Sequence, residues 1–297
     1  MNMKKILFIS KTHGLCNRLR SLVGFHALSR LQGVPFAVCW VKDNSCNSEI
    51  SDIFEIDNFE IISRRELDRI KNNKDISIFE DVRWFNCIWE DYLKDSIKWE
   101  DYRKIVCECF DSLTLKSHIQ EKVNTFLRGL PTKNLYGIHI RMTDNLDAFQ
   151  KWQGRVPDFN IDYISTLPGF EKYICDRISA DPSANFFLAT DNPEIDKKLK
   201  DKFPDKVYSY KKEFNDFRKK TFSWRQLKYV DQYQRTTSID DALIDIYLLT
   251  KCREIVGTYF SSFSKFSAVW GRVPYYEVRG DNYVKTDFVQ KMTGLDL

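Results

Sequence analysis

Three observations predict an α/β protein made of two domains with parallel sheets. Short apolar runs alternate with stretches of helical spacing, and this order of strand and helix is typical of a parallel sheet covered on both faces. The chain has 297 residues, which is enough for two domains of ordinary size. Gly129 and Pro131 end a helix between two such series, so we place the domains at 1–130 and 131–297.

The N-terminal domain is expected to open with a strand and a helix. Lys4–Ser10 is an apolar run, and Asn17–Gln32 has helical spacing and ends at Gly33. The section 81–110 is rich in Trp, Tyr and acidic residues but has no clear period, so we assign no element to it. The other expected elements are strands at 35–41, 58–63 and 76–79 and helices at 64–72 and 114–130.

The C-terminal domain is expected to repeat the same order of elements. It opens with the strand that begins at Leu135, followed by a polar loop over 142–160. A charged stretch over 211–228 is expected to be mostly solvated. The other expected elements are strands at 185–189, 206–210 and 254–257 and helices at 161–178, 193–203, 239–252 and 262–270, the first of them broken near Pro168.

Composition excludes several classes of protein. The 46 basic and 42 acidic residues give a net charge of only +4 and are scattered, which argues against nucleic acid as a partner. The apolar run near the start is about four residues, far below a signal peptide, and no stretch approaches the roughly 20 apolar residues of a membrane span. The eight cysteines show no CxxC pair, so we expect free thiols in a cytoplasmic protein and no metal site.

Polar residues follow three strands of the C-terminal domain. They occupy 139–144, with His139 and Arg141, then 189–192, and then 261–264. Because the carboxyl ends of parallel strands meet at one edge of a sheet, all three can face one ligand. The plain alternative is that His139 and Arg141 are ordinary residues of a half-exposed strand.

These loops carry the groups that a nucleotide requires. Arg141 is always charged and can bond two phosphate oxygens at once. Ser261 and Ser262 start a helix whose N–H groups point at an anion, so with Arg141 they would hold a pyrophosphate. Asp191 or Asp245 could accept hydrogen bonds from a ribose or a base.

The first turn of the N-terminal domain is a further candidate. Gly14 lets backbone approach a ligand closely, and the helix that begins near Asn17 offers free N–H groups to an anion or a sugar hydroxyl. A plain structural turn would also account for this glycine.

Taken together, the motifs resemble those of a known family. They are the segments 137–144, 188–192 and 243–250, the last running into 257–262, and together they extend over roughly residues 135 to 270. The sequence resembles the GDP-fucose-dependent fucosyltransferases of the α1,6 and nodulation-factor type, which are related to the protein O-fucosyltransferases. Segment 14–19, Gly-Leu-Cys-Asn-Arg-Leu, resembles the glycine loop of that superfamily more loosely.

The resemblance implies a GT-B fold, with two Rossmann-like domains whose parallel sheets face each other across a cleft. The C-terminal domain would bind GDP-fucose, the N-terminal domain would take the oligosaccharide or glycoconjugate acceptor, and the tail 281–297 could pack back on it. The reaction would be inverting, without a metal or a cofactor. The implied roles are Arg141 on the β-phosphate, His139 and Asp245 near the guanine, and Ser262 on the pyrophosphate.

The general base is expected in the loop after Arg141, since this loop must run from the phosphate past the sugar. We prefer Asp147 as the base and Asp144 as the organiser of the loop, with His13 as an outside candidate. Met142 and Asn145 replace an arginine and a lysine usual in the α1,6 enzymes, and Phe149 lies near the position of their catalytic glutamate. A transferase for another GDP-sugar such as GDP-mannose, or a non-catalytic nucleotide- or glycan-binding protein, therefore stays an alternative.

Overall fold

A computed structural model describes residues 4–43, 45–141, 160–214 and 237–297. Its internal contacts divide the chain into two compact units. Unit 1 contains residues 1–120 and 292–294, and unit 2 contains residues 121–291 and 295–297. The division falls within helix α6 (Ser117–Arg128), earlier in the chain than the expected boundary at residue 130.

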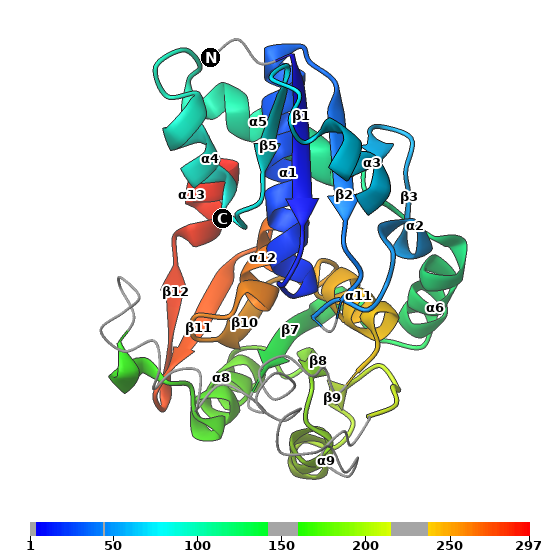
Figure 1. The fold of residues 1–297 in the computed structure, drawn as a ribbon. Helices are drawn as coiled ribbons and strands as arrows, with labels where there is room; N and C mark the ends of the chain where they lie inside the picture. Colours follow the sequence, from blue (N-terminus) through cyan, green and yellow to red (C-terminus); the bar gives the residue numbers. More distant parts are fainter. Residues whose placement is uncertain (1–3, 44, 142–159, 215–236) are drawn as a thin grey trace. The chain divides into compact units, whose positions relative to one another are not determined.

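Unit 1 is built on a four-stranded parallel sheet in the order β4-β2-β1-β5 (Figure 1). A short antiparallel pair, β3 with β6, lies apart from this sheet. The elements are β1 (Lys5–Ser10), α1 (Leu15–Gln32), β2 (Phe36–Trp40), α2 (Ile50–Ile53), β3 (Phe54–Glu55), β4 (Glu60–Ile61), α3 (Arg64–Ile70), β5 (Ile76–Phe79), α4 (Phe85–Tyr92), α5 (Trp99–Asp111) and β6 (Thr114–Leu115).

Strand β1 is buried on both of its faces, as its continuous apolar run requires. On one face Phe8 packs against Phe25 of α1, with ring centroids 5.4 Å apart. On the other face Leu7 and Ile9 belong to a cluster that includes Leu67 of α3. The sheet of unit 1 therefore has helices on both sides.

Unit 2 is built on a six-stranded sheet in the order β12-β11-β10-β7-β8-β9 (Figure 1). All its strand pairs are parallel except β11 with β12, which are antiparallel at one edge. The elements are η1 (Thr132–Asn134), β7 (Leu135–Ile140), η2 (Ile161–Tyr163), α8 (Leu167–Ala180), β8 (Asn185–Thr190), α9 (Pro193–Lys202), β9 (Val207–Tyr208), α11 (Ile239–Leu249), β10 (Ile255–Thr258), α12 (Ser262–Gly271), β11 (Tyr275–Arg279), β12 (Asn282–Thr286) and α13 (Phe288–Thr293).

The central strand β7 is also covered on both faces. Ile138 and Ile140 share a buried cluster with Phe170 of α8 and Leu199 of α9. On the opposite face, a Cβ atom at Gly137 would lie 2.9 Å from Leu249 Cδ2 of α11. Because that contact leaves no room for a side chain, α11 packs directly on the backbone of β7.

Several expected boundaries differ from the observed ones. Thr114 and Leu115 form β6, so α6 begins later than the expected helix over 114–130. The break expected near Pro168 separates η2 from α8, because proline occupies the first turn of α8, where no N–H is needed. The unassigned section 81–110 contains α4 and most of α5.

Candidate active site

The topology of unit 2 defines one preferred place for a ligand. From β7 the chain moves to β8 and β9 on one side, and it then crosses to β10 on the other side of β7. In open α/β sheets, ligands bind outside the carboxyl ends of the strands at such a switch point. This point lies between the ends of β7 and β10, where His139 and Arg141 meet the turn after Thr258.

The strand register brings the three polar loops to the same edge. His139 pairs with Gly257 of β10 on one side and with Ala189 of β8 on the other. Ile140 pairs with Thr190, so Arg141 and Asp191 leave neighbouring strands at the same level. Arg141, Asp191 and the turn that begins at Tyr259 are therefore adjacent along one sheet edge.

His139 is buried, with 5% of its surface exposed. Its ring stacks on Phe263 of α12 at a centroid distance of 4.5 Å and an interplanar angle of 11°. Burial, followed by the positive charges of Arg141 and Lys212, lowers the pKa of His139 to about 3. The imidazole is therefore neutral at physiological pH, with one donor and one acceptor nitrogen.

One nitrogen of this ring has no partner in the described part of the chain. Nδ1 of His139 is buried and makes no hydrogen bond there. An unsatisfied buried polar atom is costly, and such atoms in native proteins often face a ligand site. His139 is thus ready to bind a polar group that the described part of the chain does not supply.

A hydroxyl of β10 joins the ends of the two strands at the switch point. The backbone N–H of Arg141 donates to Thr258 Oγ1 at 2.9 Å. Thr258 Oγ1 in turn donates to the carbonyl oxygen of His139 at 3.2 Å. These bonds fix the backbone from which the half-buried Arg141 side chain departs.

The turn between β10 and α12 is tightly constrained. Phe260 has a φ of +62°, a left-handed conformation that is unfavourable for a bulky residue. Ser261 caps α12 by accepting a hydrogen bond from Phe263 N at 3.3 Å. Ser262 is the first residue of the helix, so its N–H belongs to the positive end of the helix dipole.

Asp245 lies on α11 and is buried, and it forms an ion pair with Lys212. The side chain of Lys212 is only 2% exposed, so the expectation of a mostly solvated stretch over 211–228 is wrong at this residue. Arg253, a cation close to Asp245 in the sequence, donates to Asn134 Oδ1 at 3.0 Å. Because Lys212 also contributes to the lowered pKa of His139, both lysine and carboxylate belong to the surroundings of the site.

The segment Thr190–Asn192 also has a structural task. Thr190 Oγ1 accepts a hydrogen bond from Asn192 N at 3.2 Å. Asn192 caps α9 by accepting from Glu194 N at 2.9 Å and from Ile195 N at 3.3 Å. Asp191, half-buried between them, is left at the sheet edge at the level of Arg141.

In unit 1, Gly14 forms the N-terminal boundary of α1 with a φ of −66°, and α1 has no side-chain cap. A Cβ atom at Gly14 would meet nothing within 4 Å. Neither backbone conformation nor packing therefore demands glycine, and the space beside it is open. Asn17, expected to start the helix, instead lies within its first turn, since α1 begins at Leu15.

Two expected catalytic residues cannot be placed. Asp144 and Asp147 lie outside the described residues. The same holds for Met142, Asn145 and Phe149, which depart from the family pattern. His13, the outside candidate for the base, is half-buried, and its pKa is lowered by burial and by the charges of Arg18 and Arg20.

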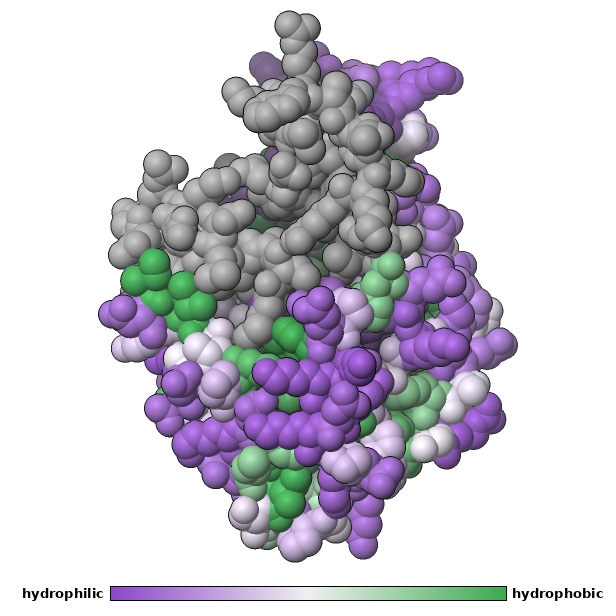
Figure 2. Space-filling model, turned by 90° about the horizontal axis from the view of Figure 1, so that it is seen from below, coloured by the Kyte–Doolittle hydropathy of each residue, from purple (hydrophilic) through white to green (hydrophobic). Residues whose placement is uncertain are grey.

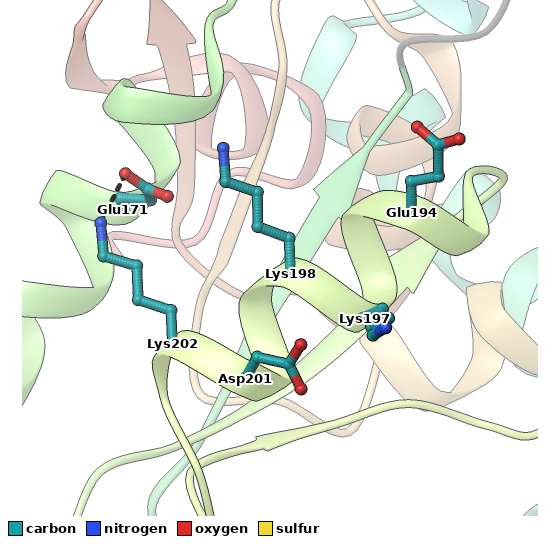
Figure 3. A pocket seen from close by; sticks show the side chains of 6 residues that line it. All are labelled: Glu171, Glu194, Lys197, Lys198, Asp201 and Lys202. Carbon is teal, nitrogen blue, oxygen red and sulfur yellow. Dashed lines mark hydrogen bonds and ion pairs between the residues drawn. The ribbon is translucent and has the colours of Figure 1, made fainter.

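A shallow depression of about 600 Å³ lies elsewhere in unit 2, on α8 and α9 (Figure 3). Three acidic and three basic side chains line it, and one pair, Lys202 with Glu171, is in contact at 2.8 Å. Hydrophilic side chains dominate the described surface on the side where α9 lies (Figure 2). We interpret this depression as a solvated charged surface. Its lining residues are Glu171, Glu194, Lys197, Lys198, Asp201 and Lys202.

Within the described ranges, no group of three or more His, Cys, Asp or Glu side chains is placed to hold a metal ion. Over the same ranges, no helix combines the length and the apolar character needed to cross a membrane.

No family model matches the chain, and no curated protein sequence matches it either. Solved structures do match its fold. The structure of NodZ alpha-1,6-fucosyltransferase co-crystallised with GDP superposes with a TM-score of 0.55 at 14% identity, covering 95% of this chain and 98% of that chain. The fucosyltransferase NodZ from Bradyrhizobium gives a TM-score of 0.52 at 14% identity, covering 96% and 99%.

POFUT1 in complex with GDP gives a TM-score of 0.53 at 12% identity, covering 92% of this chain and 95% of that chain. The match extends over both units in each comparison, because it covers almost the whole chain. The fold class predicted from the sequence, an α/β protein of GT-B type, is therefore confirmed, and the chain has the fold of these fucosyltransferases.

Proposed function

We propose that this protein is an inverting glycosyltransferase that moves fucose from GDP-fucose to a hydroxyl of a glycan acceptor without a metal ion. The observation that carries the proposal is the switch point of unit 2. There a neutral histidine with an unpartnered buried nitrogen, an arginine and a helix N-terminus lie at one sheet edge. Two proteins that share the fold, NodZ and POFUT1, were solved with GDP.

In the proposed complex the charged end of the donor lies against Arg141 and the start of α12. Arg141 bonds the β-phosphate, and Ser261 and Ser262 offer hydroxyl and N–H groups to the pyrophosphate. This arrangement supplies the countercharge that a metal would give in other transferases. Gly14 and Asn17 of unit 1 are proposed to contact the sugar end of the donor.

The guanine is proposed to lie near His139 and Asp245. Nδ1 of His139 would gain the hydrogen bond that it lacks in the described structure. A carboxylate can accept from two N–H groups of a guanine edge, so Asp245 could bind the base while it keeps its ion pair with Lys212. Asp191, at the same edge, is proposed to accept from the ribose.

The transfer step needs no group beyond these and one base. The acceptor oxygen attacks the anomeric carbon of fucose from the side opposite the pyrophosphate, as the bond from that carbon to the β-phosphate oxygen breaks. The acceptor proton passes to the base, for which Asp147 is proposed, with Asp144 as organiser of its loop. GDP leaves with the bonding electrons, and Arg141 stabilises the charge that grows on its β-phosphate.

The compartment proposed for this reaction is the cytoplasm. All eight cysteines are free thiols, and thiols persist in reducing compartments.

A nucleotide panel tests the donor assignment. GDP, UDP and ADP are titrated into the full chain and into a His139→Ala variant, and binding is measured by calorimetry. We expect the wild type to prefer GDP and the variant to lose much of that preference, because the buried nitrogen contacts the base. Equal affinity for the three nucleotides would remove the guanine assignment.

A further inference from the structure

Arg20 of α1 is a guanidinium that the fold leaves without an anion. Its Nε is buried and makes no hydrogen bond, and the whole side chain has no ion pair in the described part of unit 1. The guanidinium carbon lies 4.6 Å from the ring centroid of Trp84. Arg20 is half-buried, and a partly desolvated cation without a countercharge is unfavourable, which makes Arg20 a candidate for binding an external anion.

The neighbouring Arg18 shows what a structural arginine looks like on the same helix. Its Nε donates to His13 O at 2.6 Å and its Nη1 to Val41 O at 2.6 Å. Its Nη2 lies 2.7 Å from Asp43 Oδ2. Arg18 thus holds the loops after β1 and β2 through two carbonyl oxygens and one carboxylate, whereas no such bond to Arg20 is found in the described part of unit 1.

The fold holds Arg20 and Trp84 in a fixed arrangement. Ser21, next to Arg20 on α1, accepts a hydrogen bond from Arg83 N at 2.7 Å and donates one to Arg83 O at 3.1 Å. These two bonds tie the residue before Trp84 to the helix that carries Arg20. The contact between Arg20 and Trp84 is therefore supported by the backbone of both segments.

This pair lies at the switch point of the unit 1 sheet. Strand β1 has β2 on one side and β5 on the other. Arg20 is on the helix that follows β1, and Trp84 is in the loop that follows β5. The rule that places a ligand between β7 and β10 in unit 2 places a second one here.

Three carboxylates of unit 1 that follow β2 and β5 are paired with other cations. Glu80 pairs with Lys11 at 2.5 Å, Asp43 pairs with Arg18, and Asp91 pairs with Arg83. Burial lowers the pKa of Arg20 to about 10, so the side chain stays charged at neutral pH. Asn17 lies three residues before Arg20 on α1, which places the two residues on the same face of the helix.

We propose that Arg20 binds the acidic group of a sugar, a carboxylate or a phosphate, and that the acceptor of this enzyme is an acidic glycan. A guanidinium can bond two oxygens of either group in one plane, and Trp84 holds the charged group against its ring. The binding site stands on the structure of unit 1 alone. The identification of its ligand as an acceptor rests on the proposed function.

Direct binding to simple probes tests this assignment. Glucuronate, glucose 6-phosphate and glucose are titrated into the full chain, and saturation-transfer NMR gives each dissociation constant. We expect glucuronate or glucose 6-phosphate to bind at least about tenfold more tightly than glucose, and the better of the two identifies carboxylate or phosphate. Arg20→Gln should remove about ten- to hundredfold of that affinity, the usual effect of losing a hydrogen bond to a charged group.

Arg30→Gln is the matched control, since it removes one positive charge from the same helix at a residue that pairs with Glu108 at 2.7 Å. It should bind all three probes as the wild type does. Arg20→Lys keeps the positive charge and should bind the acidic probes more tightly than Arg20→Gln does. It also provides a test of the assignment if Arg20→Gln folds poorly. The assignment is wrong if acidic sugars bind no better than glucose, or if Arg20→Gln binds them normally.

GDP binding, measured in the same samples, separates this inference from the proposed function. A wild type that binds acidic sugars but no GDP would contradict the transferase proposal and leave the Arg20 site intact. If Arg20→Gln weakens the binding of GDP and leaves the binding of the acidic sugar unchanged, Arg20 belongs to the donor site and the inference is wrong.

Discussion

Arg141 is the residue on which the proposed chemistry depends most. Its backbone N–H is bonded to Thr258 at the point where β7 and β10 separate, so the side chain starts from a rigid position. We predict that Arg141→Ala lowers the transfer rate by about a hundred- to thousandfold, the usual loss when a preorganised donor to developing charge is removed. Steady-state measurement of GDP release tests this.

Arg141→Lys should recover little of the lost rate, because an ammonium cannot bond two oxygens in one plane. Turnover near that of the wild type in either variant would exclude Arg141 from the site.

Asp147 is the proposed base. We predict that Asp147→Asn lowers the transfer rate by about a hundredfold or more while GDP binding stays intact, since an amide cannot take the proton. Calorimetry of GDP binding beside the rate measurement separates the two effects. If Asp147→Asn transfers normally and Asp144→Asn is inactive with GDP still bound, the two roles must be exchanged.

His139 should make stability depend on pH. Its pKa is about 3 in the folded protein and about 6.5 in an unfolded chain. Between these values the unfolded chain binds the proton more tightly, so lowering the pH from 7 to 5 favours unfolding. We expect His139 to account for about 2 kcal/mol of the stability lost over that range.

The test compares wild type and His139→Asn by denaturant unfolding at pH 7 and pH 5. The variant should lose less stability on acidification. Equal losses in the two proteins would mean that His139 is not held neutral by burial.

At the scale of elements, alanine substitutions at two glycines distinguish a role in packing from a role in binding. A Cβ atom at Gly257 of β10 would lie 2.1 Å from Ser264 Oγ of α12, so we predict that Gly257→Ala costs about 1 to 3 kcal/mol of stability. Gly14→Ala meets no atom within 4 Å and should cost under about 1 kcal/mol. Thermal unfolding measures both.

The affinity for GDP-fucose adds a second measurement on the Gly14→Ala variant. Gly14→Ala should weaken GDP-fucose binding if the open space beside Gly14 admits the donor. If Gly14→Ala unfolds at a clearly lower temperature than the wild type, or if Gly257→Ala does not, the packing derived at these two glycines is incorrect.

The sequence predicted the elements whose apolar pattern is long or strictly periodic. Strands β1, β7 and β8 and helix α1 follow from continuous buried runs and a clear C-terminal glycine. Helix α5 was not predicted, because the section 81–110 shows no clear period as a whole, although Tyr102, Val106 and Cys109 form a buried stripe at helical spacing within it. The last strands, β11 and β12, also went unassigned.

Less of the candidate site than of the fold could be predicted from the sequence. Loops after parallel strands meet at one edge by geometry, so the proximity of Arg141 and Asp191 could be predicted. The ion pair of Lys212 with Asp245 joins a residue of a charged stretch to a residue of an apolar helix. No local sequence pattern predicts this pair. The lack of an ion pair at Arg20 is a property of its three-dimensional surroundings, since Arg18, two residues earlier, forms an ion pair with Asp43.

At the scale of the whole molecule, each unit has its own parallel sheet with its own switch point. In unit 2 that point carries the groups proposed to hold GDP-fucose. In unit 1 it carries Arg20 and Trp84, proposed to hold the acidic acceptor. A transferase needs both ligands, and the two sheets offer one preferred place for each.

The most direct test of this account is the consumption of GDP-fucose by the full chain in excess EDTA, with and without a mixed pool of glycan acceptors, followed as GDP release and fucose incorporation. We predict that GDP and fucosylated product form together, that both require an acceptor, and that GDP-mannose is not used. Transfer that depends strictly on manganese or magnesium, equal use of GDP-mannose, or no transfer from a donor that binds would contradict the account.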